Sequence, residues 1–116
     1  MHTAAVFPHG KVKDEDDVIK PAVNGTLSVC RGAAKHGIKR LVMTSSEAAV
    51  KSSKDKKDTH KTVEHWSYTE GNSPYFKAKT LAEKAAWNFQ KEMPEESRFE
   101  LVSINPGFVM GPNIST

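Results

Sequence analysis

The sequence predicts an α/β fold in which helices cover a small parallel sheet, and three observations support this. Apolar residues recur at helical spacing in two segments, at about 15–36 and 74–93. Two short apolar runs, at 38–44 and 99–104, indicate buried strands. The segments alternate as strand tail, helix, strand, loop, helix and strand, which is typical of parallel βαβ units with right-handed crossovers. With 116 residues, the chain has room for one small domain.

The first helix is predicted over about 15–36. Acidic residues at 14–17 suit a helix N-terminus, because the helix dipole stabilises negative charge there. Pro21 falls early enough to be tolerated near the first turn. Cys30 lies on the apolar stripe, where a buried structural thiol is expected. Gly37 is a typical C-cap residue, so the helix is expected to stop just before it.

The two strands are expected to lie next to each other in the sheet. The first has an apolar core at 41–43, and the second is ended by the Asn-Pro-Gly sequence at 105–107. Residues 1–7 look like the tail of a further strand that runs into a loop at 8–10. The other edge of the first strand is therefore expected to be poorly covered, and an exposed parallel edge favours self-association.

The second helix is predicted over about 74–93. Pro74 suits the first helical turn, and Pro94 cannot continue a helix. The residues before it, 47–72, are polar and lack periodicity, which predicts a long loop. Loops of that length in a compact domain are usually functional or mobile.

Composition excludes several classes of protein. Hydrophobic residues make up 37% of the chain and the mean hydropathy is −0.56, which predicts a thin core and no membrane span. The net charge of +3 is too small to indicate nucleic-acid binding, and the lysines at 51–57 are interspersed with aspartates as in a solvated loop. The single cysteine excludes an intrachain disulfide, and the histidines lack metal-site spacing. We therefore expect a soluble cytoplasmic protein that binds no metal, nucleic acid or membrane.

A candidate proton-transfer site combines a phenol, an ammonium and a hydroxyl. Tyr75 and Lys79 are four residues apart, so a helix places both on one face. A nearby ammonium stabilises a phenolate, which lets a phenol exchange a proton with a carbonyl or alcohol oxygen at neutral pH. Ser45 and Ser46 end a predicted strand, where ligands of parallel sheets collect. A serine there can hold the substrate oxygen beside the phenol.

Each of these features also has an ordinary structural explanation. A lysine-rich chain contains the Tyr-x-x-x-Lys spacing by chance, and serines after a strand often cap a turn or a helix. Gly107 lets the backbone approach a ligand closely, but residues 105–109 also suit a simple turn. Asn24 lies in the middle of a helix, where it either faces solvent or bonds a backbone carbonyl or a water near the site.

Five segments in order resemble the extended short-chain dehydrogenase/reductase superfamily, and within it the dihydroflavonol reductase and cinnamoyl-CoA reductase group most closely. The segments are HTAA at 2–5, VIKPAVNGT at 18–26, LVMTSS at 41–46, YxxxK followed by TLAEKAAW at 75–87, and NPGFVMGP at 105–112. The resemblance covers nearly the whole chain. It implies a partial Rossmann-type parallel sheet, the middle βαβαβ portion of an NAD(P)-binding domain that takes in residues 1–116.

The resemblance also implies site residues. The catalytic serine of the family falls on Ser46, with Ser45 a weaker candidate, and its tyrosine and lysine fall on Tyr75 and Lys79. Asn24 matches a helix position whose asparagine can join a proton relay. The residues implied to contact the cofactor are Thr3, Ala4 and Ala5 on the adenosine-ribose side, Tyr75 and Lys79, and Pro106, Gly107, Phe108 and Val109 beside the nicotinamide.

The implied activity is that of an oxidoreductase that uses NAD or NADP, with NADP slightly favoured. Such an enzyme reduces the carbonyl of an aldehyde, ketone or CoA thioester, or runs the reverse reaction. The family pattern also contains a Gly-rich strand-turn-helix, which binds the pyrophosphate, and a C-terminal substrate-binding region. Neither occurs in this sequence, so we expect a central fragment that binds dinucleotide weakly and is inactive when isolated.

Two alternatives stay open at this point. The chain could be an inactive remnant or interaction module that pairs with a full-length relative, or the product of an incomplete gene model. The two long helices are the expected surface for such pairing, or for a homo-oligomer.

Overall fold

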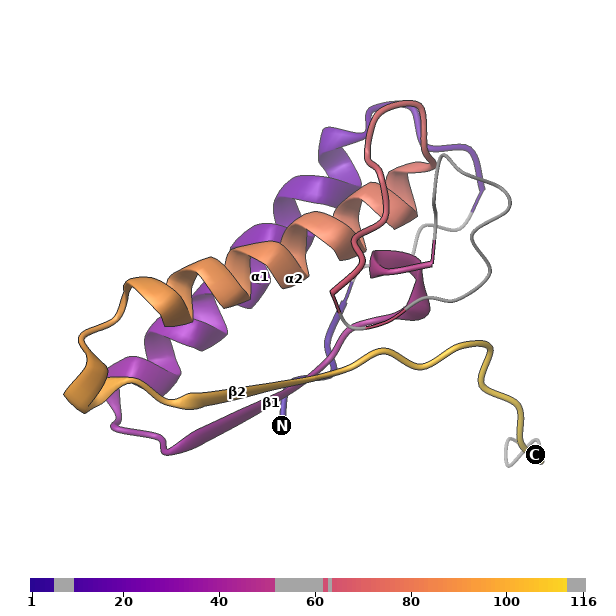
Figure 1. The fold of residues 1–116 in the computed structure, drawn as a ribbon. Helices are drawn as coiled ribbons and strands as arrows, with labels where there is room; N and C mark the ends of the chain where they lie inside the picture. The colour runs from indigo at the N-terminus through magenta and orange to yellow at the C-terminus, as the bar shows by residue number, and fades with distance from the viewer. Residues whose placement is uncertain (6–9, 52–61, 63, 113–116) are drawn as a thin grey trace.

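The computed structural model describes residues 1–5, 10–51, 62 and 64–112. Two helices, α1 (Asp16–Lys35) and α2 (Pro74–Glu92), lie side by side over two parallel strands, β1 (Arg40–Thr44) and β2 (Glu100–Ile104) (Figure 1). Short 3₁₀ turns, η1 (Glu47–Ala49) and η2 (Glu95–Ser97), precede the loop and β2, respectively. The predicted α/β class with a parallel sheet is therefore confirmed.

The two strands are neighbours in the sheet, as predicted. β1 and β2 pair in parallel from Arg40 opposite Glu100 to Thr44 opposite Ile104. The N-terminal strand tail is present as a parallel bridge, because the N–H of His2 donates to the Val42 carbonyl at 2.8 Å and its carbonyl accepts from the N–H of Thr44 at 2.8 Å. Backbone groups alternate in direction along a strand, so His2 lies on the edge of β1 away from β2. Among the described residues, that bridge is the only cover on this edge.

The first helix starts and ends as its residues predict. The side chain of Asp14 accepts a hydrogen bond from the N–H of Asp16 at 3.0 Å, and Asp16 and Asp17 place negative charge in the first turn. Gly37 follows the helix with φ of 61°, a conformation that favours glycine. Pro21 lies inside the helix near its start, as predicted, and the helix continues through it without that backbone N–H donor.

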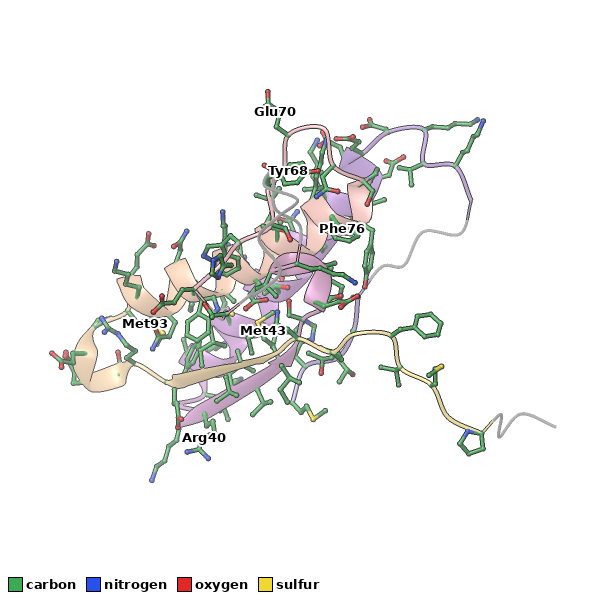
Figure 2. The ribbon with its side chains drawn as sticks, turned by 45° about the vertical axis from the view of Figure 1, so that its right-hand side comes forward. Arg40, Met43, Tyr68, Glu70, Phe76 and Met93 are labelled. Atoms are coloured by element: carbon green, nitrogen blue, oxygen red, sulfur yellow. The ribbon has the colours of Figure 1, made fainter. Side chains whose placement is uncertain are left out.

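The second helix also has the predicted termini. Ser73 caps it by accepting a hydrogen bond from the N–H of Phe76 at 3.4 Å, and Pro74 occupies the first turn. Met93 has extended backbone angles, as expected of the residue before Pro94. Figure 2 shows Phe76 at the start of this helix and Met93 at its end.

The polar segment 47–72 departs in part from the predicted loop. Its first residues form η1, because the Ser46 hydroxyl oxygen accepts from the N–H of Ala48 at 3.2 Å and caps the turn. Ala48 and Ala49 are buried there, against the polar character of the surrounding sequence. Residues 52–61 and 63 of the predicted loop lie outside the described residues.

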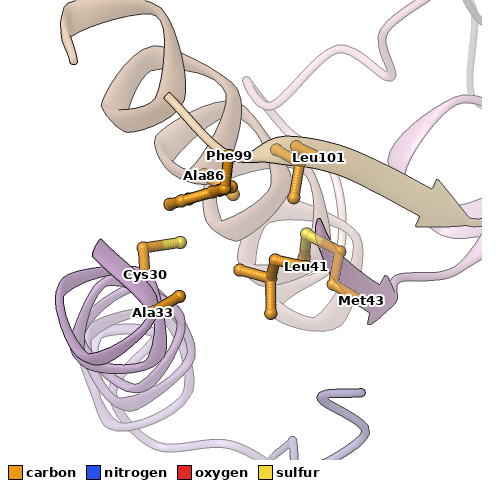
Figure 3. Packing of buried hydrophobic residues seen from close by; sticks show 7 residues of the cluster. All are labelled: Cys30, Ala33, Leu41, Met43, Ala86, Phe99 and Leu101. Atoms are coloured by element: carbon orange, nitrogen blue, oxygen red, sulfur yellow. The ribbon is translucent and has the colours of Figure 1, made fainter. Parts of the chain in front are cut away.

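The core lies between the helices and the inner face of the sheet, as Figure 3 shows. Phe99 is 1% exposed and its ring stacks on Phe89 with a centroid distance of 6.4 Å. Cys30 is buried as predicted, and burial raises the pKa of its thiol. The core is as thin as the composition predicts and consists of Cys30, Ala33, Leu41, Met43, Ala86, Phe99 and Leu101.

In the described part of the chain, no helix is long and apolar enough to cross a membrane.

Candidate active site

A pocket of about 500 Å³ opens where the carboxyl end of β1 meets the first turns of α2. The N-terminal segment and one face of α1 complete its walls. This is the edge of a parallel sheet at which ligands usually bind. Its polar lining residues are His2, Thr26, Thr44, Ser45, Tyr75 and Lys79.

Tyr75 and Lys79 lie one turn apart on α2, and both line the pocket. The Lys79 ammonium is 5.8 Å from the centroid of the Tyr75 ring, which confirms that the two side chains share a helix face. Burial lowers the pKa of Lys79, while the negative charge of Glu83 opposes that shift. The site therefore holds a half-buried cation beside a phenol.

The structure separates the two adjacent serines. Ser45 lines the pocket, and its hydroxyl is buried without a hydrogen-bond partner among the described residues. Ser46 is also buried, but it does not line the pocket, and its oxygen accepts from the N–H of Ala48. That bond leaves the hydroxyl proton of Ser46 available for donation. The assignment of Ser46 as the catalytic serine stays a prediction, and the structure adds Ser45 as the serine that opens on the pocket.

The residues predicted to contact a cofactor divide into two groups. Ala4 and Ala5 line the pocket beside β1, whereas Thr3 is exposed and does not. The predicted relay residue Asn24 is likewise exposed on α1 and outside the pocket lining. These two roles stay predictions.

The segment after β2 does not reach the pocket. The Pro106 carbonyl accepts a hydrogen bond from the N–H of Glu47 at 2.9 Å, which fixes the start of the segment. Gly107 lies beside the same residue, because a Cβ atom there would be 3.4 Å from a carboxylate oxygen of Glu47, which is ordinary van der Waals contact. Phe108 is 89% exposed and Val109 is 79% exposed. The structure therefore does not bring these predicted nicotinamide contacts together with Tyr75 and Lys79.

Three polar pocket residues were given no role from the sequence, namely His2, Thr26 and Thr44. His2 reaches the pocket because its backbone pairs with β1, and the predicted strand tail and the family segment at 2–5 were the features that pointed to it. Burial lowers the pKa of the His2 imidazole, and the positive charges of Lys79 and the chain N-terminus lower it further. Thr26 is 5% exposed on α1, and its only signal in the sequence was its place at the end of the family segment at 18–26.

The arrangement suits proton exchange with a bound oxygen atom. The phenol of Tyr75 and a pocket hydroxyl such as that of Ser45 can donate hydrogen bonds to a carbonyl oxygen. The ammonium of Lys79 stabilises negative charge on its neighbours. In the described residues, no group of three or more histidine, cysteine or acidic side chains is placed to hold a metal ion.

Comparison with known proteins defines the class first. The structure is similar to that of the yeast methylglyoxal/isovaleraldehyde reductase Gre2 complexed with NADPH, with a TM-score of 0.80 and 34% identity over 98% of this chain and 37% of that one. The fold is thus that of the Rossmann-type reductases.

The particular family follows from the sequence. The chain belongs to the 3-beta hydroxysteroid dehydrogenase/isomerase family, whose model matches residues 1–116. It is 38% identical to a cinnamoyl-CoA reductase, CAD2, of Medicago truncatula, over 97% of this chain and 35% of the relative. It is 36% identical to the dihydroflavonol 4-reductase of Arabidopsis thaliana, over 100% of this chain and 31% of the relative. The resemblance to the reductase group is confirmed, and the chain spans about a third of the length of these relatives.

Proposed function

We propose that this chain is the catalytic segment of an NADPH-dependent reductase that converts a carbonyl group to an alcohol or aldehyde, or runs the reverse reaction. The substrate class is an aldehyde, a ketone or a CoA thioester. The observation that carries the proposal is the pocket at the end of β1, which is lined by Tyr75, Lys79 and Ser45, whose hydroxyl has no hydrogen-bond partner among the described residues. Relatives with NADPH in their names favour NADP over NAD.

The pocket residues fit the nicotinamide end of such a cofactor. The buried hydroxyl of Ser45 lacks a partner in the described part of the chain, and the Lys79 ammonium stands in the same pocket. Both groups donate hydrogen bonds of the kind that ribose hydroxyls and carbonyl oxygens accept. When bound, the cofactor would supply a hydride to the substrate carbon.

The chain's own residues would handle the proton. Tyr75 would donate its phenolic proton to the substrate oxygen as negative charge develops there, or accept one in the reverse direction. Lys79, one turn away, would stabilise the phenolate that remains. A serine hydroxyl would hold the substrate oxygen, with Ser46 supported by the family pattern and Ser45 by its place in the pocket.

A chimera tests this proposal, because the chain matches about a third of the yeast reductase Gre2. Residues 1–116 replace the matching third of that enzyme, and the absorbance of NADPH is followed with an aldehyde, a ketone or a CoA thioester. We expect NADPH oxidation with at least one of these substrates. Lys79→Met is expected to abolish most of it, whereas Lys84→Met on the same helix is the matched control, since Lys84 lies 5.3 Å from the ring of Trp66 instead. A folded chimera that binds NADPH and reduces none of the three substrates would refute the proposal.

A second candidate function is an interaction module that pairs with a full-length relative or with a second copy. The outer surfaces of α1 and α2 are the proposed contact, and exposed Leu81 of α2 (36%) favours it. Ile104 on β2 (48% exposed) and Met110 (83% exposed) add apolar surface outside the helices. Light scattering of the purified chain over a range of concentrations tests this, and a monomer at every concentration would argue against it.

A further inference from the structure

A buried carboxylate connects α2 to the ends of both strands. Glu83 is 4% exposed, and both of its carboxylate oxygens accept hydrogen bonds. One bond comes from the side-chain amide of Asn105 at 2.7 Å, and the other from the indole N–H of Trp87 at 3.3 Å. Asn105 directly follows β2, so this contact ties the helix to the carboxyl edge of the sheet.

The same amide group holds the end of β1. The side-chain nitrogen of Asn105 also donates to the Ser46 carbonyl at 3.0 Å, and its oxygen accepts from the Ser103 hydroxyl at 3.3 Å. Two backbone bonds support the connection, from the N–H of Ser45 to Ile104 at 2.8 Å and from the N–H of Glu47 to Pro106 at 2.9 Å. The turn that carries the two serines is thus attached to the end of β2 by three hydrogen bonds.

Burying a carboxylate to make such a connection costs free energy. An ionised group away from water loses its hydration, and an uncharged residue of similar shape is often more stable in the same place. Both donors to Glu83 are neutral, so among the described residues no ion pair of matched charge offsets the burial. A positive charge elsewhere would offset the cost of burying the Glu83 carboxylate. Lys79 lies one helical turn before Glu83 on α2.

We propose that Glu83 is a positioning residue of the candidate active site, which holds the Ser45–Ser46 turn through Asn105 and balances the charge of Lys79. This inference rests on the proposed function, because the Ser45–Ser46 turn and the Lys79 ammonium act together only in the proposed proton transfer. In the described residues, the titratable groups that act on or contact Lys79 are His2 from the N-terminal segment and Tyr75 and Glu83 from α2. Of these, Glu83 supplies the negative charge.

Two measurements on the ligand-free chain separate a positioning role from simple packing. The first is the pKa of Lys79, followed by NMR titration of the chain labelled at lysine Cε and assigned with Lys79→Arg. Glu83→Gln keeps the shape and removes the charge, so the pKa of Lys79 is expected to fall below its value in the unaltered chain. Glu83→Asp keeps the charge and is expected to retain that value, and Glu92→Gln, an exposed change on the same helix, is the matched control.

The second measurement is hydrogen exchange of the Glu47 amide. Asn105→Ala removes the bridge to Ser46, so this amide is expected to exchange about fivefold to tenfold faster, as for the loss of one hydrogen bond. The amides of α1 are the internal reference, and only a change confined to the turn supports the proposal. This arm also decides the outcome if Glu83→Gln fails to fold.

Either of two results overturns the inference. One is a Lys79 pKa that is equal in Glu83→Gln and Glu92→Gln, and the other is unchanged exchange at Glu47 in Asn105→Ala. Both readouts are obtained without cofactor or substrate, so they stand or fall separately from the activity of the chimera. A folded chimera that binds NADPH and is inactive, with both effects present in the chain, would refute the reductase proposal and leave the positioning contacts established.

Discussion

Phe99 and Phe108 lie just before and just after β2, and the chain surrounds them very differently. Phe99 is 1% exposed and stacks on Phe89 of α2, while Phe108 is 89% exposed. The first belongs to the core that holds α1, α2 and the two strands together, and the second to the segment that the family resemblance places beside the nicotinamide. In this chain, the helices and strands around Phe99 are therefore held by packing, and the candidate pocket with Tyr75 and Lys79 lies on that packed part. In the described part of the segment after β2, Phe108, Val109 and Met110 are 79–89% exposed and are not buried to a comparable extent.

Substituting the two phenylalanines should give the largest contrast. Phe99→Ala leaves a cavity in a thin core and is expected to destabilise the fold by about 3–5 kcal/mol. Phe108→Ala removes a solvated ring and is expected to change stability by less than about 0.5 kcal/mol. Urea denaturation followed by circular dichroism measures both. Equal losses would show that the segment after β2 packs on the domain in solution.

NADPH affinity probes the same contrast from the ligand side. The sequence contains no Gly-rich phosphate loop, and Val109 and its neighbours stand exposed outside the pocket. A few hydrogen bonds from Tyr75 and Lys79, at roughly 1 kcal/mol each, do not offset the entropy lost on binding. Fluorescence titration of the 116-residue chain with NADPH is therefore expected to show no saturation at micromolar concentrations. Micromolar affinity would mean that the exposed segment closes over the cofactor by itself.

Two ion pairs at opposite ends of the sheet should differ more modestly. Lys77 contacts Glu15 at 2.6 Å across the N-terminal ends of the two helices, and its side chain is 17% exposed. Arg40 contacts Glu100 at 2.6 Å where both strands start, with side chains 63% and 55% exposed. Double-mutant cycles are expected to give about 0.5–1 kcal/mol for the first pair and about 0–0.5 kcal/mol for the second, because solvent screens the exposed pair. A larger coupling energy for Arg40 and Glu100 than for Lys77 and Glu15 would contradict this expectation.

The smallest expected effect is a pH dependence from His2. The pKa of His2 in the folded chain is lowered below its ordinary value of 6.5, so protonation favours the unfolded chain. The contribution to stability is present above pH 6.5 and is lost as the pH falls below it. Melting temperatures between pH 7.5 and about 5.5 should therefore decline less in His2→Gln than in the unaltered chain. His36→Gln, at an exposed histidine, is the matched control, and equal slopes in all three would contradict the assignment.

Local periodicity was enough to predict the helices, the strands and the shared face of Tyr75 and Lys79. These features depend on residues within one element, where spacing decides which side chains meet. Which of the two serines lines the pocket could not be predicted from spacing, because it depends on which hydroxyl caps η1. The contact between Glu83 and Asn105 could not be predicted either. The two residues are 22 positions apart, in a helix and after a strand, so no local spacing relates them.

The most direct test of the account compares the two tyrosines of the chain in the Gre2 chimera. Tyr75 lines the pocket beside Lys79, whereas Tyr68 precedes α2 and lies outside the pocket lining. The account predicts that Tyr75→Phe lowers kcat by at least about 100-fold, the usual contribution of a general acid. It also predicts that Tyr68→Phe leaves kcat close to that of the parent chimera. An active chimera with the same kcat in both variants would contradict the central claim that Tyr75 transfers the proton.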